Sequence, residues 1–221
     1  MNSVCMATYN GEKFLREQID SIIAQLDESD ELIISDDGSN DATLDILYSY
    51  NDSRIKIFHN KYNHGVNRNF ENALIHANGD YIFLSDQDDV WKKDKIRICL
   101  SALNDCDLVV HDCQITDSNL NIVSQSLFMV LGAKPGVLCN ILKNGFTGCC
   151  MAFRKEVLES IIPFPKSIKF YHDQWIGLKA TLKFRVAFIN IGLIYFRRHS
   201  SNSSSVAEKS KLTLIDKFNY R

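Results

Sequence analysis

The first 110 residues alternate short, almost wholly apolar runs with segments whose apolar residues recur at helical spacing, and no other feature constrains the fold as strongly. The short runs predict strands and the periodic segments predict helices. Strands that are joined through helices pair in parallel and are covered on both faces, which explains why polar residues do not alternate along them. The chain is therefore expected to form an α/β fold with a mostly parallel, Rossmann-like sheet flanked by helices.

The predicted elements follow one another with short connections. In the first half, strands are expected at residues 3–8, 31–35, 54–59, 81–84 and 107–110. The helices between them are expected at residues 14–26, 44–50, 70–77 and 91–100. The second half is less regular, with loops and short helices over 114–145, a strand at 146–153, helices at 156–162 and 173–182, and a hairpin with arms at 186–189 and 193–197.

The charge of the chain is nearly balanced but unevenly distributed. With 25 basic and 27 acidic side chains the net charge is −2, so no general nucleic-acid-binding function is expected. Residues 197–221 carry six basic and two acidic side chains, which makes this segment +4 and the rest −6. Because apolar residues lie among its lysines, the segment either lies on an anionic membrane surface or forms an ordinary amphipathic helix that packs on the protein or a partner.

The cysteines and the start of the chain bear on the cellular compartment. None of the seven cysteines is spaced as CxxC, so we expect reduced, mostly core residues, with zinc binding or a disulfide as the alternative. The chain begins without a basic segment and enters an apolar strand at once, which predicts no cleaved signal peptide. No apolar run approaches the roughly 18 residues of a membrane span. A cytoplasmic protein is expected, either free or at the inner face of the cell membrane.

Polar side chains gather where the predicted parallel strands end. They are Thr8-Tyr9-Asn10 after the first strand, Asp36-Asp37 after the second and Asp86-Gln87-Asp88-Asp89 after the fourth. Ligands of such sheets bind beyond the carboxyl ends of the strands. The sequence therefore predicts a ligand site at this edge of the sheet.

The carboxylates at 86–89 need a compensating interaction. Two unit charges 4 Å apart repel by about 4 kcal/mol at an effective dielectric constant near 20, so the three groups are expected to be well solvated or to meet a cation. Hard divalent cations use one or two carboxylates together with phosphates of a substrate. The alternative is an acidic helix N-terminus. Tyr9 also has two possible roles: its ring either stacks on a nucleotide base or packs within its own loop and holds that loop in place.

Five segments, in order along the chain, resemble glycosyltransferase family 2, whose members are inverting nucleotide-sugar enzymes with the GT-A fold. They are residues 3–11, 34–39, 63–66 with Asn69, 79–91 and 195–202. The motifs DQDDVW at 86–91 and Tyr-x-Arg-x-His at 195–199 are most similar to those of the bacterial rhamnosyltransferase-like branch. The resemblance implies a single GT-A domain over 1–205, with a nucleotide-binding half at 1–112 and a smaller, mixed acceptor-binding half at 113–205, before a basic tail or the start of a helix at 206–221.

The resemblance also implies an activity. The chain is expected to move one sugar from a dTDP- or UDP-sugar, dTDP-rhamnose among them, to a hydroxyl of a saccharide or lipid-linked saccharide acceptor in polysaccharide, O-antigen or capsule biosynthesis. One sugar per acceptor is expected because the Gln-x-x-Arg-Trp motif of processive members is absent. In-line attack on the anomeric carbon inverts it without an enzyme nucleophile.

The family's nucleotide-binding positions carry over onto this chain as follows. Asp37 is expected to accept the imide N–H of uracil or thymine, and Tyr9 to lie under the base. Asp86 is expected to face the ribose or the donor sugar. The full implied set is Ala7, Thr8, Tyr9, Asp37, Asn63, Gly65, Asn69 and Asp86.

A Mn²⁺ or Mg²⁺ ion is implied at Asp88, with His199 as a second ligand. A divalent cation on the leaving diphosphate stabilises the charge that grows as the glycosidic bond breaks. Asp89 is expected to support the loop and Arg197 to lie near the donor. The alternative for the basic pair at 197–198 is a solvated strand end.

Asp173 matches the family's catalytic base, which removes the proton of the acceptor hydroxyl. The family often has Glu before this Asp where the present chain has His172, and the alternative is that Asp173 only caps a helix. Trp175 is expected near the acceptor, and Gly148 in a small-residue strand that lets the donor approach.

Two other functions share parts of this sequence pattern. A sugar-phosphate nucleotidyltransferase would use a similar sheet, but residues 9–13 match its glycine-rich phosphate loop poorly. A degenerate member of the family would bind a nucleotide-sugar without turnover, and the presence of Asp37, Asp86, Asp88 and Asp173 argues against it.

Overall fold

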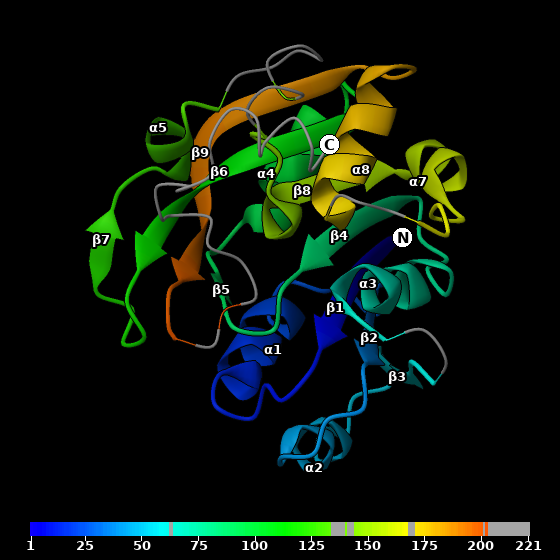
Figure 1. Ribbon diagram of the computed structural model, residues 1–221, viewed down its shortest axis with the longest axis vertical. Helices are drawn as coiled ribbons and strands as arrows, with labels where there is room; N and C mark the ends of the chain where they lie inside the picture. Colours follow the sequence, from blue (N-terminus) through cyan, green and yellow to red (C-terminus); the bar gives the residue numbers. More distant parts are fainter. Residues whose placement is uncertain (62–63, 134–139, 141–143, 168–170, 201, 203–221) are drawn as a thin grey trace.

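The computed structural model describes residues 1–61, 64–133, 140, 144–167, 171–200 and 202. Within them one curled sheet runs in the order β3-β2-β1-β4-β8-β6-β9-β5, and β7 pairs with β6 beside this path (Figure 1). The strands are β1 Asn2–Thr8, β2 Glu31–Asp36, β3 Ile55–His59, β4 Tyr81–Ser85, β5 Val90–Trp91, β6 Leu108–Thr116, β7 Ile122–Ser124, β8 Met151–Arg154 and β9 Val186–Arg197.

Helices cover both faces of the sheet, and a single 3₁₀ turn precedes β8 (Figure 1). They are α1 Leu15–Ile23, α2 Thr43–Tyr48, α3 Val66–Leu74, α4 Lys95–Ala102, α5 Leu127–Leu131, η1 Gly148–Cys150, α7 Lys155–Ile161 and α8 His172–Thr181. None of the helices in the described ranges is long and apolar enough to cross a membrane. The tail at 206–221 lies outside the described residues.

The first half of the sheet confirms the predicted parallel arrangement. Strands β3, β2, β1 and β4 pair in parallel, with Thr8 opposite Asp36 and Met6 opposite Ser85. Apolar side chains of the inner strands are buried on both faces, as in the run Leu32–Ile34 of β2, whereas those of the edge strand β3 are partly buried. Because the registers align the strand ends, the polar residues that follow β1, β2 and β4 meet at one edge of the sheet.

The second half is mixed. Strand β8 pairs antiparallel with both β4 and β6, while β9 runs parallel to β6. The strand expected at 146–153 begins only at Met151, after η1. Trp91 lies in β5 rather than in a helix, and α4 starts after Asp94, whose φ of 67° is left-handed and breaks the helix there.

The predicted hairpin at 186–197 is wrong. Residues 186–197 form one strand, β9, which pairs with β6 along its whole length, from Val186 opposite Leu108 to Arg197 opposite Thr116. The register shifts between His111 and Asp112, so the turn-forming residues Asn190 and Ile191 are accommodated as a bulge. A long partner strand from far earlier in the chain overrides the local turn signal.

Glycine at position 177 lets α8 approach the core closely. A Cβ atom on Gly177 would lie 2.3 Å from Cγ of Phe146 and 2.4 Å from both Cδ atoms. Phe146 is buried and lines the cleft described below. The helix α8 can therefore pack this close to the ring of Phe146 because residue 177 has no side chain.

We expect Gly177→Ala to lower the free energy of unfolding by about 1–3 kcal/mol, because overpacking forces the ring or the helix to move. Helix propensity alone predicts the opposite sign, a gain of about 1 kcal/mol. Urea unfolding followed by circular dichroism measures the change. Adding Phe146→Leu should restore part of the loss; a stabilised Gly177→Ala single variant would contradict the packing.

Candidate active site

A cleft of about 830 Å³ opens at the edge of the sheet where β1, β2 and β4 end. It is also lined from the opposite side by residues of η1 and α8 and by the segment after β9. The cleft brings together most of the residues singled out in the sequence, namely Ala7, Thr8, Tyr9, Asp37, Gly65, Asn69, Asp86, Asp88, Gly148, Asp173 and His199. Asp89, Trp175 and Arg197 do not line it, and Asn63 lies outside the described residues.

Two adjacent acids at the end of β2 have different tasks. The carboxylate of Asp36 is buried and accepts hydrogen bonds from the backbone N–H groups of Gly38 (3.0 Å) and Ser39 (2.9 Å). It also accepts one from the hydroxyl of Thr8, at 3.1 Å. Asp36 thus closes the turn and fastens it to β1, so it has little capacity left for a ligand.

Asp37 lines the cleft instead. Its Oδ1 accepts from Nδ2 of Asn60 (2.8 Å) and lies 3.1 Å from Nδ1 of His64, and its Oδ2 accepts from the backbone N–H of Gly65 at 2.8 Å. Gly65 has a φ of 107°, a conformation that favours glycine, at the start of α3. Asp37 is therefore a fixed acceptor at the rim of the cleft.

Asn69 lies on α3 and reaches the end of β1. Its Nδ2 donates to the carbonyl of Thr8 at 3.0 Å, and the residue is 2% exposed. Its Oδ1 has no hydrogen-bond partner among the described residues. An unpaired buried acceptor costs about 1–3 kcal/mol, so this oxygen is a candidate for contact with a bound molecule.

The acidic loop, residues 86–89, is held from one side by the segment after β9. Oδ2 of Asp88 lies 2.9 Å from Nε2 of His199 and accepts from Nδ2 of Asn202, also at 2.9 Å. Asp88 and His199 both line the cleft. A carboxylate and an imidazole side by side form a donor set suited to a divalent cation such as Mn²⁺.

Arg197 anchors this loop from within the protein. Its side chain is 3% exposed, and its Nε donates to the carbonyl of Asp88 at 2.8 Å. Its backbone N–H donates to Oδ1 of Asp89 at 3.0 Å. Its other guanidinium nitrogens bind the carbonyl of Ser118 (2.8 Å) and the carboxylate of Glu17. Arg197 thus fixes the backbone of the acidic loop and does not reach into the cleft.

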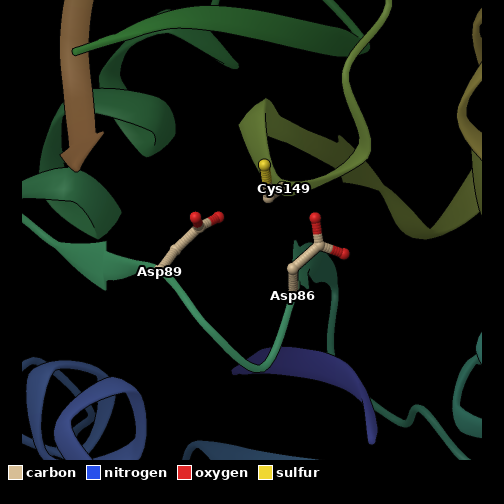
Figure 2. A group of neighbouring side chains, drawn as sticks. All are labelled: Asp86, Asp89 and Cys149. Atoms are coloured by element: carbon tan, nitrogen blue, oxygen red, sulfur yellow. The ribbon is translucent and has the colours of Figure 1, made fainter. Parts of the chain in front are cut away.

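Asp86, Asp89 and Cys149 form a second group on the inner side of the acidic loop. Figure 2 shows the two carboxyl groups and the thiol converging from the loop and from η1, and the ligand atoms of all three lie within 4.8 Å of one another. Oδ2 of the fully buried Asp89 has no hydrogen-bond partner in the described part of the chain. This group is oxygen-rich and also able to hold a cation.

Burial shifts the protonation of this group. Burial, with Asp88 and Asp173 as neighbouring negative charges, raises the pKa of Asp86 to about 7. Burial also holds the pKa of Asp89 well above its usual range. Lys95 is a basic neighbour of this group: its buried Nζ donates to the carbonyl of Cys149 at 2.8 Å and lies 3.8 Å from the centre of the Trp91 ring.

Asp173 lies in the first turn of α8 and lines the cleft. Its Oδ1 accepts from the backbone N–H of Gln174 at 2.6 Å, and burial raises its pKa to about 6. The preceding His172 stacks on Phe70 with ring centres 3.8 Å apart, and burial lowers its pKa to about 3, so it is neutral. A half-buried carboxyl with a pKa near neutrality is suited to accept a proton.

Trp175 faces away from the cleft. Its indole N–H donates to the carbonyl of Ile161 at 3.1 Å, which joins α8 to α7. The sequence interpretation also missed residues that the structure brings to the site: Gln87, Asn60, Lys95 and Asn202. Asn202 and Gln87 both belong to segments that resemble the family, so their positions were usable signals. Asn60 and Lys95 carry no local pattern.

The raised pKa of Asp173 has a consequence for stability. Its pKa is about 6 in the folded protein against 3.8 as an ordinary value, so the ionised form is disfavoured by folding. Asp173→Asn should therefore raise the free energy of unfolding by about 2 kcal/mol at pH 8. The gain should shrink as the pH falls through 6 and vanish below 4.

Urea unfolding at several pH values measures this difference. Asp45→Asn, on the exposed first turn of α2, is the matched control, since it removes an acid from a helix start outside the cleft. A gain for Asp173→Asn that is the same at pH 4 and pH 8, or a loss at pH 8, would contradict the burial of an ionisable carboxyl.

The chain is similar to known proteins over most of its length. The sequence profile described as Glycosyl transferase family 2 matches residues 3–162. The Escherichia coli UDP-Glc:alpha-D-GlcNAc-diphosphoundecaprenol beta-1,3-glucosyltransferase WfgD is 29% identical over 214 residues, which cover 95% of this chain and 81% of WfgD. The dTDP-rhamnosyl transferase RfbG of Shigella flexneri is 42% identical over 106 residues, 44% of this chain and 36% of RfbG.

Solved structures agree on the fold. S. aureus TarS in complex with UDP-GlcNAc has a TM-score of 0.72 at 22% identity, over 91% of this chain and 59% of TarS. Glucosyl-3-phosphoglycerate synthase from Mycobacterium tuberculosis, in complex with Mn²⁺, UDP and glucosyl-3-phosphoglycerate, has a TM-score of 0.63 at 19% identity, over 90% of this chain and 72% of the synthase. These likenesses show the GT-A fold.

The present chain spans 66% of the length of a Nostoc sp. glycosyltransferase with which it shares 28% identity. The family match nevertheless extends over more than half of the chain, from β1 to the residue after α7. The chain belongs to glycosyl transferase family 2.

Proposed function

We propose that the protein transfers one sugar from a UDP- or dTDP-sugar to a hydroxyl of a saccharide acceptor, free or lipid-linked, in the synthesis of a cell-surface polysaccharide. The observation that carries the proposal is that one cleft joins Asp37, Asp88 and Asp173, three carboxyl groups in three different settings. WfgD, named for UDP-Glc and a diphosphoundecaprenol acceptor, and RfbG, named for dTDP-rhamnosyl transfer, support this choice of substrates.

Asp37 would select the base. Its two oxygens are oriented by Asn60 and Gly65, and an ionised carboxylate can only accept hydrogen bonds. The imide N–H of uracil or thymine is a matching donor, whereas cytosine has none at that position. Tyr9, whose side chain is about half exposed at the same end of the cleft, would offer its ring for stacking.

Asp88 and His199 would hold Mn²⁺ or Mg²⁺ beside the donor diphosphate. Both line the cleft, whereas of the inner group of Figure 2 only Asp86 does, so a diphosphate would meet Asp88 and His199 but not Asp89 or Cys149. A bound divalent cation supplies positive charge against the leaving diphosphate. Asn202, through its hydrogen bond to Asp88, would orient the carboxylate.

Asp173 would act as the base. It takes the proton of the acceptor hydroxyl, and the oxygen attacks the anomeric carbon from the face opposite the diphosphate, which inverts that carbon. Asp86 lines the cleft with Asp88 and Asp173 as neighbouring charges, and it would face the ribose or the donor sugar. Asn69 offers its unpaired Oδ1 to the nucleotide from α3.

Release of nucleoside diphosphate from a panel of UDP- and dTDP-sugars with Mn²⁺ and saccharide acceptors tests the activity. We expect one donor to be used, and Asp88→Asn to lower kcat by about two orders of magnitude because the cation loses a ligand. Chelation with EDTA should have the same effect, and Asp45→Asn should have none. Tight binding of a donor without release would favour the degenerate family member, and pyrophosphate formed from a sugar phosphate and a nucleoside triphosphate would favour the nucleotidyltransferase.

The pH dependence of transfer tests the role of Asp173. Because only the ionised carboxyl accepts a proton, kcat/KM should rise with pH and level off above its pKa of about 6. Asp173→Asn should lower kcat by about 100-fold or more while the Kd of the nucleotide stays within about twofold. An unchanged pH profile in a variant that still transfers sugar would remove Asp173 from the reaction.

A further inference from the structure

Gln87 lies between Asp86 and Asp88 in the chain, yet its side chain binds a different segment. Its Oε1 accepts a hydrogen bond from the backbone N–H of Tyr9 at 2.9 Å, and its Nε2 donates to the carbonyl of Tyr9 at 3.0 Å. The two segments are 78 residues apart in sequence. One planar amide therefore joins the acidic loop to the first residue after β1.

These two hydrogen bonds hold both peptide planes that flank the Cα atom of Tyr9. The N–H belongs to the preceding plane and the carbonyl to the following one, so the bonds restrict both φ and ψ of this residue. Only an amide offers an acceptor and a donor in one rigid group. The direction in which the Tyr9 side chain leaves the backbone, toward the cleft, is thus set by Gln87.

The next residues are shaped around the same contact. Asn10 adopts a left-handed φ of 47°, and its backbone N–H donates to the hydroxyl of Ser39 at 2.9 Å. A Cβ atom on Gly11 would lie 2.3 Å from Oε1 and 2.7 Å from Cδ of Gln87. The close approach of the Gln87 amide thus requires glycine at position 11.

We propose that Gln87 is a positioning residue that acts through Tyr9 and thereby determines the affinity of the cleft for the nucleotide base. The inference rests on the proposed nucleotide site. The two hydrogen bonds of Gln87 make the orientation of the Tyr9 ring, and so its stacking surface, dependent on the acidic loop. Gln87 adds nothing to the chemistry of transfer beyond this.

A double-mutant cycle tests whether Gln87 acts through Tyr9. The Kd of UDP and of dTDP is measured by calorimetry for the wild type, Gln87→Ala, Tyr9→Ala and the double variant. Tyr9→Ala should raise the Kd about 5- to 100-fold, the range of one lost base–aromatic stack. Gln87→Ala should raise it several-fold in the wild type but less than about twofold in the Tyr9→Ala background. At saturating donor, kcat of Gln87→Ala should stay within about twofold of the wild type, so the loss falls on KM.

Two further variants separate positioning from stability. Gly11→Ala should reproduce the effect of Gln87→Ala, because the added Cβ atom displaces the Gln87 amide. If Gln87→Ala does not fold, the same double-mutant cycle is run with Gly11→Ala in its place. Gln25→Ala is the matched control. The Nε2 of Gln25 donates to the carbonyls of Ser21 and Lys92, both at 3.1 Å, outside the cleft. The substitution should therefore lower the Tm without changing the Kd of UDP or of dTDP.

The outcomes are distinct. Equal losses of affinity from Gln87→Ala with and without Tyr9 would overturn the inference, as would an unchanged Kd with a reduced kcat, which would assign Gln87 to the acidic loop alone. In either case the proposed function would stand. A wild-type protein that binds neither UDP nor dTDP would overturn both.

Discussion

The site depends on the hydrogen bonds that the buried Arg197 donates to the acidic loop. The guanidinium reaches from the last residue of β9 to the carbonyl of Asp88, while the backbone N–H of Arg197 binds the carboxyl of Asp89. A buried cation that loses its partners costs several kcal/mol, so the acidic loop and the end of β9 stabilise each other. The acids at 86–89 lie close together on a backbone that is fixed in this way, and burial raises the pKa of Asp86 and Asp89, which favours their neutral forms and weakens the repulsion.

The parallel part of the sheet, β1 to β4, could be predicted from sequence because its signals are local. Continuous apolar runs specify buried parallel strands, and the residues that follow them must meet at one edge. The hairpin expected at 186–197 failed for the opposite reason. The partner of β9 is β6, far earlier in the chain, and the turn signal at Asn190 describes only a bulge in that pairing.

The site shows the same division. Asp37, Asp88 and Asp173 could be named as candidates because the types and order of their neighbours resemble a family. The separate role of Asp36 could not be predicted, since it depends on hydrogen bonds from Thr8, Gly38 and Ser39 that form only in the folded chain. Gln87 stands in a segment that resembles the family, but its role could not be predicted, because its partner is the backbone of a residue 78 positions earlier in the chain. Trp175 was expected near the acceptor, yet its indole joins two helices.

The bulges in β9 act as a spacer with a defined length. Nine residues of β6 are matched by twelve of β9, and this difference brings Arg197 opposite Thr116. Side chains of a strand alternate between its faces, and an odd surplus in a regular strand would turn Arg197 outward; here the two register shifts absorb the surplus of three residues. A change in length between 186 and 197 would therefore have to be absorbed at one of these two register shifts for Arg197 to stay opposite Thr116.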